Sequence, residues 1–308
     1  MSEVLQISPR ITCLPVIHGS GEFALAVRRV MLEQKFDCLA VPLPASFQAD
    51  VERGIELLPA AGLVVQIPRV TWGTGLDWNA EEERHGDDEA DDIEEPPRSY
   101  VPIDPCQPVI AALRAAMSEH IPRAFIDLET TLFKPNSAVL PDPYALKRVS
   151  LERFATAVLP AIARPAQQQV RDRILHMGAK LRELEQRYKS ILLVCSVLDW
   201  PWIREAYVEQ TPPTADHDDA GETTLYQADP RTLLFLLGEL PFITGLYERA
   251  RAELEDDENL SLDGVKELLI TAREAYKADL KQRARKITPH LLRQCLKYIR
   301  NLSLMSRR

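Results

Sequence analysis

The stretch LPVIHGSGEFALAVRRVMLEQKFDCLAVPLP, residues 14–44, decides the fold. It opens with a short apolar run that ends in HGSG, and residues 21–34 then carry apolar side chains at helical spacing. A second apolar run, DCLAV at 37–41, ends at a proline-bounded segment. A strand, a helix and a second strand in this order predict two parallel strands joined by a helix.

The same alternation continues along the chain. Further apolar runs occupy residues 62–67, 99–103, 123–127 and 191–197, and helix-length segments separate them. The clearest helix covers 166–187, where apolar residues recur every three or four positions. We therefore expect an α/β fold, in which all these runs and 12–17 form one mostly parallel sheet flanked by helices.

Charge divides the chain further. The 308 residues carry a formal net charge of −9; residues 81–95 alone contribute −9, and residues 273–308 contribute +9. Residues 73–97 bury too little apolar surface to order themselves, so we expect an acidic insertion that can be removed without unfolding the core. We expect an α/β core over 1–210 and a mainly helical region over 211–308, with a weak strand at 223–227.

The basic end of the chain has two interpretations. Lys and Arg clusters can bind nucleic acid, but on helices they more often solvate a polar face. Only Tyr276 and Tyr298 offer aromatic stacking there, so we expect no nucleic-acid partner. The amphipathic stretch 287–302 is instead expected to dock on a partner protein.

Other features predict a cytoplasmic protein without a membrane span. No apolar run approaches the roughly 20 residues that a membrane helix needs, and MSEVLQISPR does not resemble a signal peptide. The five cysteines form no CxxC pair, which is typical of reduced, buried thiols.

Candidate site residues follow the strands, because sites in parallel sheets form beyond the carboxyl ends of the strands. His18 and Glu22 follow the first strand, Asp127 and Glu129 follow the run at 123–127, and Asp199 follows the last core strand. Each residue could instead have a structural role. His18 could be a hydrogen-bonded structural histidine, and each acid could be a helix-capping or loop carboxylate. Together they predict a common cleft with shifted pKa values.

The segment HGSGE matches neither a nucleophile elbow nor a phosphate-binding loop. Ser20 is a candidate N-cap for the following helix, and free amides at that helix start could hold an anion. The first role is the more common one for a tight turn between strand and helix.

Three segments together resemble the superfamily of TraB, TIKI, ChaN and erythromycin-esterase-like proteins, in particular a bacterial branch of it. They are residues 14–44 as quoted above, YVPIDPCQPVIAALRAAMSEHIPRAFIDLE at 100–129, and RDRILHMGAKLRELEQRYKSILLVCSVLDWPWIREA at 171–206. The resemblance implies parallel strands with a cleft at their carboxyl ends. Some members of this superfamily are metal-dependent proteases or esterases, and others bind haem or act in signalling. The resemblance implies a function among these.

The resemblance assigns roles to particular positions. It matches the first-strand histidine to His18, the arginine that opens the long helix to Arg171, and the FIDLE acid to Asp127. The acid expected after the second strand falls near Pro42, and the histidine expected after the last core strand falls at Asp199. A His and carboxylate metal site is thus incomplete, so we expect no tightly bound Zn²⁺ and can assign no cofactor.

Three functions remain open. The first is a catalytically degenerate member that serves as a binding or interaction module. The second is a hydrolase of esterase or peptidase type with a rearranged site. In it His18 acts as base or ligand, Asp127 and Asp199 orient or ligate, and Arg171 holds an anionic substrate group or stabilises an oxyanion. The third is a polyanion binder that uses residues 273–308. For a buried Arg171 we expect Asp127 or Glu129 as ion-pair partner.

Overall fold

The computed structural model describes residues 5–67, 98–218, 221–253 and 260–305, and the chain divides into two compact units. The first unit covers Met1–Gly238 and the second covers Glu239–Arg308. This division falls later than the boundary expected after residue 210, because a strand at Thr223–Gln227 pairs inside the first unit. The predicted acidic insertion at 73–97 lies outside the described residues.

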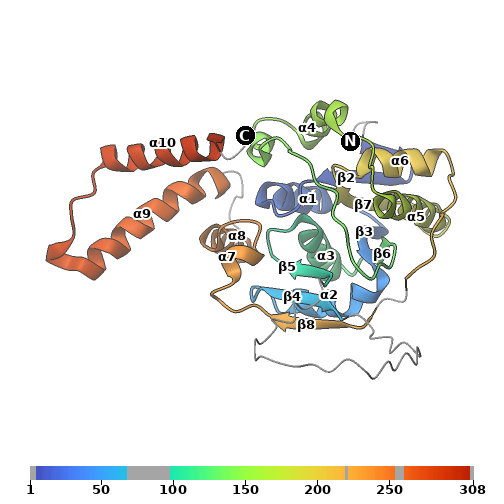
Figure 1. The fold of residues 1–308 in the computed structure, drawn as a ribbon, viewed down its shortest axis with the longest axis horizontal. Helices are drawn as coiled ribbons and strands as arrows, with labels where there is room; N and C mark the ends of the chain where they lie inside the picture. Colours follow the sequence, from blue (N-terminus) through green and yellow to red (C-terminus); the bar gives the residue numbers. More distant parts are fainter. Residues whose placement is uncertain (1–4, 68–97, 219–220, 254–259, 306–308) are drawn as a thin grey trace, which may run out of the picture. The chain divides into compact units, whose positions relative to one another are not determined.

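The main sheet contains five strands in the order β1-β2-β7-β3-β6 (Figure 1). Strands β2, β7, β3 and β6 run parallel, and the short β1 pairs antiparallel with β2 at one edge. Their bounds are Gln6–Ser8 for β1, Ile11–Val16 for β2, Cys38–Pro44 for β3, Arg123–Asp127 for β6 and Ile191–Ser196 for β7. The α/β class with mostly parallel strands is therefore confirmed.

Helices cover both faces of this sheet. The chain crosses the sheet in one direction from β2 to β3 to β6, and in the opposite direction from β6 back to β7. Right-handed crossovers therefore place the first helices on one face and the last on the other. Figure 1 shows this arrangement for α1 (Gly21–Glu33) and α3 (Pro108–Ser118) against α5 (Gln168–Glu185) and α6 (Trp200–Val208).

Two predicted strands belong to a different sheet, which corrects the expectation of one sheet. Strands β4 (Gly62–Gln66) and β5 (Tyr100–Ile103) pair antiparallel with each other, and β4 also pairs antiparallel with β8 (Thr223–Gln227). Burial alternates along β4, which is typical of an antiparallel sheet with one covered face. That face packs on α2 (Gln48–Glu56).

Long connections carry the remaining elements of the first unit. The segment from residue 128 to 167 contains α4 (Leu151–Val158), and α7 (Leu233–Leu236) follows β8. At the end of the first unit, the backbone of Gly238 passes very close to the turn that follows β2. A Cβ atom on Gly238 would meet Gly19 Cα at 2.3 Å, and the Gly238 amide donates to Asp104 Oδ2 at 2.8 Å. Only glycine permits this backbone approach.

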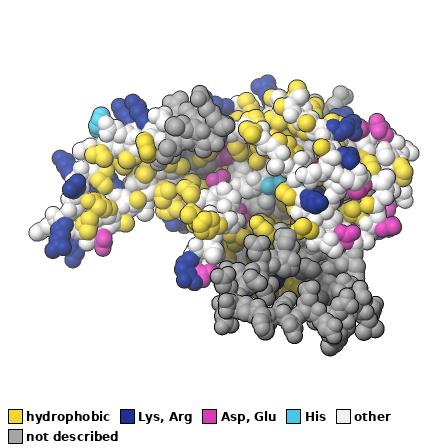
Figure 2. Space-filling view, viewed as in Figure 1, with side chains coloured by type: hydrophobic (Ala, Val, Ile, Leu, Met, Phe, Trp, Pro, Cys, Tyr) yellow, Lys and Arg dark blue, Asp and Glu magenta, His cyan; other side chains and the backbone are white. Residues whose placement is uncertain are grey.

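The second unit consists of helices in its described part. They are α8 (Pro241–Glu253), α9 (Leu260–Leu280) and α10 (Pro289–Met305). Figure 2 shows Lys and Arg side chains around the connection from α9 to α10, where the sequence has Lys281, Arg283, Arg285 and Lys286. Within the described ranges, no helix is both long and apolar enough to cross a membrane.

None of the five cysteines forms a disulfide. Four of them are buried, as the sequence predicts, but Cys295 on α10 is exposed. Cys13 and Cys195 lie on the neighbouring strands β2 and β7 with their Sγ atoms 3.5 Å apart. Burial and the Cys13 thiol raise the pKa of Cys195 well above its ordinary value, so this thiol is unreactive.

Candidate functional site

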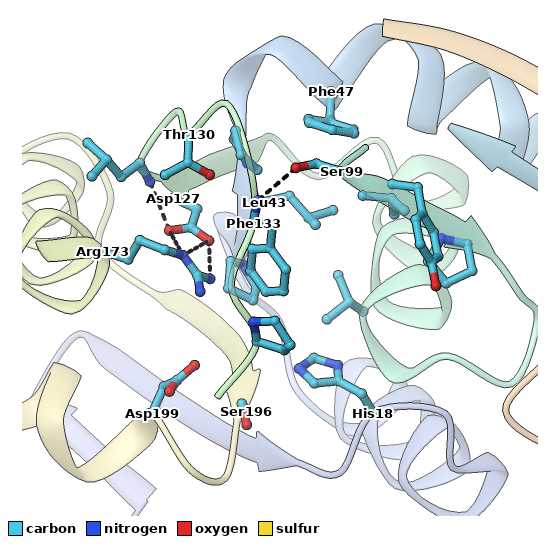
Figure 3. Close-up of a pocket in the computed structure, with 18 of the residues that line it drawn as sticks. His18, Leu43, Phe47, Ser99, Asp127, Thr130, Phe133, Arg173, Ser196 and Asp199 are labelled. Atoms are coloured by element: carbon cyan, nitrogen blue, oxygen red, sulfur yellow. Dashed lines mark hydrogen bonds and ion pairs between the residues drawn. The ribbon is translucent and has the colours of Figure 1, made fainter. Parts of the chain in front are cut away.

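A cavity of about 300 Å³ lies at the carboxyl ends of the parallel strands. Residues at or just beyond the ends of three of these strands line it: His18 after β2, Asp127 at the end of β6, Ser196 at the end of β7 and Asp199 after it. The end of β3 contributes a wall of Pro42, Leu43 and Pro44. The parallel sheet therefore brings His18, Asp127 and Asp199 to one cavity, as Figure 3 shows.

Most of the remaining wall is apolar. The apolar side chains come from the short helix after β3, from β5, from α3 and from the long connection after β6: Phe47, Val101, Pro102, Val109, Ile110, Leu128, Phe133 and Pro135. A cavity lined mainly by apolar side chains, with a few polar groups that converge on it, is typical of a small-molecule site. For comparison, an engineered apolar cavity of about 150 Å³ accommodates benzene.

The buried ion pair at this site uses Arg173 rather than the expected Arg171. Arg173 Nε donates to both Asp127 carboxylate oxygens at 3.0 Å, and Arg173 Nη2 also donates to Asp127 Oδ2. The two side chains are 5% and 2% exposed. Burial alone would lower the pKa of Arg173, but Asp127 and Asp199 outweigh it and the pKa is raised.

Arg171 lies elsewhere, and its predicted partners are wrong. Its guanidinium donates to the carbonyl oxygens of Pro165 and Ala166 and to Gln168 Oε1, which secures the start of α5. The register of the helix explains the difference. On α5 the buried side begins with Val170, Arg173, Ile174 and Met177, and Arg171 is off that side.

The Arg173–Asp127 pair is held rigidly. Asp127 Oδ1 also accepts from the Leu128 amide at 2.8 Å, and the Phe133 ring lies 4.4 Å from the Arg173 guanidinium carbon. Pairing through Nε and Nη2 turns Nη1 away from Asp127. Asp127 thus largely neutralises the positive charge of Arg173 inside the protein. Separating the pair would leave each charge buried without a counter-charge, which is strongly unfavourable.

His18 presents one ring nitrogen to the cavity. Its Nδ1 is 3.2 Å from Gln107 Oε1, which also accepts from the Gly19 amide at 3.3 Å. An amide oxygen accepts but cannot donate, so Nδ1 carries the proton and Nε2 remains an acceptor. Part of the His18 ring faces solvent through the cavity. The protein atoms around the ring still remove much of its hydration, and this desolvation lowers the pKa of His18.

Asp199 occupies the N-cap position of α6 but does not cap the helix with its side chain. The side chain is only 7% exposed and lines the cavity, where Oδ1 accepts from Asn136 Nδ2 at 3.0 Å. Burial raises its pKa, and Asp127 acts in the same direction. The hydrogen bond from Asn136 and the positive charge of Arg173 act in the opposite direction and are outweighed.

Besides Arg171, two more predicted site residues do not line the cavity. Glu129 accepts from the Ser46 amide at 2.8 Å and from Ser46 Oγ at 2.7 Å, so it ties two loops together. Glu22 is buried on α1 with Lys147 Nζ 3.6 Å from its carboxylate. Both acids therefore have structural contacts outside the cavity.

Ser20 stands at the N-cap position of α1, but its buried Oγ makes no hydrogen bond within the described structure.

Gln66 is the most unusual polar residue of the cavity wall. It ends β4 and is 1% exposed, and neither its amide nitrogen nor its amide oxygen has a hydrogen-bond partner among the described residues. Burying an amide without partners costs about 1–3 kcal/mol per unsatisfied group. A native protein retains such a group where a ligand or water completes its bonding.

Sequence reasoning missed Gln66, Gln107, Asn136, Arg173 and Ser196. Of these, only Arg173 had a usable signal, because a charged residue on the buried side of α5 requires a partner. Gln66 and Asn136 reach the cavity from the second sheet and from a long connection, whose placement the sequence pattern does not specify.

Within the part of the chain that the structure describes, no group of three His, Cys, Asp or Glu side chains could hold a metal ion. No family model, curated protein or solved structure matches this chain.

Proposed function

We propose that this chain is a ligand-binding module of the TraB and ChaN-like type that lacks the metal-dependent hydrolytic site of its relatives. Its ligand is a small, mostly apolar molecule that enters the cavity at the carboxyl ends of the parallel strands. The family assignment rests on the three resembling segments. The proposed loss of the metal site rests on Pro42 and Asp199, which stand where an acid and a histidine are expected.

One observation carries the binding function: the buried carboxamide of Gln66, which has no hydrogen-bond partner among the described residues, lies in the wall of a mainly apolar cavity. An empty apolar cavity would be more stable with a hydrocarbon side chain at this position. A ligand with one hydrogen-bonding group would satisfy this amide and bury its own apolar surface, which provides roughly 25 cal/mol per Å².

A cavity-filling variant tests this function. We expect 4-phenylbutanol to bind the wild-type protein saturably in isothermal titration calorimetry, with a dissociation constant on the order of 1 mM for so small a molecule. Val101→Trp fills the cavity and abolishes binding, whereas Val139→Trp, at a position 91% exposed, does not. Equal binding by the two variants would place the ligand elsewhere.

A hydrolase with a rearranged site is the second candidate, and the tautomer of His18 favours it. A neutral imidazole with Nε2 free to accept can act as a general base, and Ser196 lines the same cavity. In this case 4-nitrophenyl butyrate would be hydrolysed with turnover, and His18→Ala would lose at least about 100-fold in rate. Turnover that His18→Ala leaves unchanged would exclude His18 as the base.

Three finer expectations belong to this proposal. The protein acts in the cytoplasm, residues 73–97 form a dispensable acidic insertion, and residues 211–308 form a mainly helical region whose last helices bind a partner protein. Exposed apolar side chains on α10, including Leu291 and Leu296, support such a partner. We propose no nucleic-acid partner.

A further inference from the structure

We propose that the ligand of the cavity carries a cationic amine, which Asp199 binds as its counter-ion. This inference rests on the proposed ligand-binding function and names the chemical class of the ligand. It follows from the balance of fixed charge in the cavity and from the acceptors that lie beside Asp199.

The cavity offers no spare positive charge to an anionic ligand. Arg173 is the only Lys or Arg among the described residues that line it, and Asp127 already accepts its Nε and Nη2 hydrogens. The nearby His18 is kept neutral, because burial lowers its pKa. A carboxylate or phosphate ligand would therefore meet in Arg173 a cation whose charge is already paired with Asp127.

Asp199 is the carboxylate that lacks a direct charged partner in this cavity. Its one hydrogen bond in the described structure comes from the neutral amide of Asn136, through Oδ1. The side chain could have capped α6, as aspartate commonly does at this position, but it extends to the cavity instead. Oδ2 is thus available to a donor from a ligand.

The surroundings of Asp199 match the three donors of a primary ammonium group. Figure 3 shows His18, Ser196 and Asp199 along one side of the cavity. His18 Nε2 is an acceptor, Ser196 Oγ has a second lone pair beyond its bond with the Leu198 amide, and Asp199 Oδ2 supplies the negative charge. The rest of the wall is mainly apolar and receives the body of the ligand.

The charged groups near Asp199 do not reverse this preference. Arg173 repels an ammonium group, and Asp127 offsets part of this charge at Asp199, while His18 is neutral. Bringing a cation beside Asp199 also removes the penalty for an isolated buried carboxylate. An amine consequently gains more from this site than an alcohol of the same shape.

Three probes with one hydrocarbon body test the inference by calorimetry at pH 7.5: 4-phenylbutylamine, 4-phenylbutanol and 4-phenylbutyrate. We expect the amine to bind at least about tenfold more tightly than the alcohol, and the carboxylate more weakly than the alcohol. Asp199→Asn should abolish the advantage of the amine over the alcohol. Asp172→Asn, which changes a carboxylate at the start of α5 that does not line the cavity, should keep that advantage.

Asp199→Asn is expected to fold, because burial already favours the uncharged form of this side chain. An amine that binds no better than the alcohol to the wild-type protein, or a carboxylate that binds best, would overturn the inference and leave the proposed function intact. Amine binding that survives Val101→Trp would mean surface association and would also overturn it. Failure of all three probes to bind would overturn the proposed function itself.

Discussion

Arg173 shows how the position of a residue on a helix determines its role. Arg171 and Arg173 are separated by one residue, yet only Arg173 lies on the buried side of α5 and reaches Asp127. The expectation of a buried arginine paired with Asp127 had the chemistry right and the residue wrong. The apolar periodicity of α5 contained the answer, because Val170 and Met177 lie three residues before and four after Arg173.

Removing the arginine of this pair should be costly. We expect Arg173→Met to lower the free energy of unfolding by about 3–5 kcal/mol, because Asp127 stays buried without a counter-charge. The matched control Arg171→Met should cost about 1 kcal/mol or less. Urea unfolding followed by circular dichroism measures both values. The double variant Arg173→Met, Asp127→Leu should recover much of the loss, and a failure to recover would show that the charge of Asp127 is not the cause.

Replacing Gln66, unlike replacing Arg173, should stabilise the ligand-free protein. Replacing its unpartnered amide with the similar-sized side chain in Gln66→Met should raise the free energy of unfolding of the ligand-free protein by about 1–2 kcal/mol. The same change should weaken binding of 4-phenylbutanol. Gln107→Met is the control, because Gln107 Oε1 has two hydrogen bonds and its loss should cost about 1 kcal/mol. If Gln66→Met destabilised the protein, the amide would have partners in solution.

At the scale of elements, the connection after α6 fastens to the loop that follows β6. The Glu129 amide donates to His217 Nδ1 at 3.2 Å, and the Thr131 amide donates to Asp218 Oδ2 at 2.9 Å. The His217 ring also packs edge-on against His176 of α5, with ring centroids 4.7 Å apart. His176 is thus held in a tight contact within this junction, so this part of the fold should be sensitive to acid.

The pKa of His176 indicates the direction of that sensitivity. Burial lowers it below its ordinary value of 6.5, and so do His217 and Lys180, whereas Asp127 and Glu183 act in the opposite direction and are outweighed. A histidine with a lowered pKa in the folded state binds its proton more readily when unfolded. Stability is therefore complete above pH 6.5 and falls as the pH drops through 6.5 toward the lowered value.

Thermal unfolding at pH 7.5 and pH 5.5 tests this effect. The melting temperature of the wild-type protein should fall on acidification, and His176→Phe, which keeps an aromatic ring against His217, should show a smaller fall. His290→Phe, at an exposed position on α10, should behave as wild type. An unchanged pH dependence in His176→Phe would show that another group, such as His18, causes it.

The elements also show where sequence patterns stop being informative. Apolar runs predicted the parallel strands correctly, because strands buried on both faces are nearly continuous in apolar residues. The runs at 62–67 and 99–103 have the same appearance but pair antiparallel in a second sheet. Strand direction depends on the path of the connecting chain, and residues 68–97 between these runs lie outside the described structure.

At the scale of the whole molecule, the cavity depends on parts of the first unit that are far apart in sequence. The parallel sheet supplies His18, Asp127 and Asp199, which the rule about strand ends anticipates. The second sheet supplies Gln66 and Val101, and the long connection after β6 supplies a further wall. Sequence reasoning could therefore predict the polar side of the site, but not the apolar walls that make it a cavity.

The central claim is that this cavity binds a small, mostly apolar molecule, and methyl NMR during a titration with 4-phenylbutanol tests it most directly. We predict saturable chemical-shift changes at the methyl groups of Leu43, Val101, Val109, Ile110 and Leu128, all of which line the cavity. The methyl groups of Leu32 and Val208, which are 69% and 62% exposed and lie outside it, should not shift. Shifts confined to such exposed sites, or no saturable shifts at millimolar concentrations, would contradict the account.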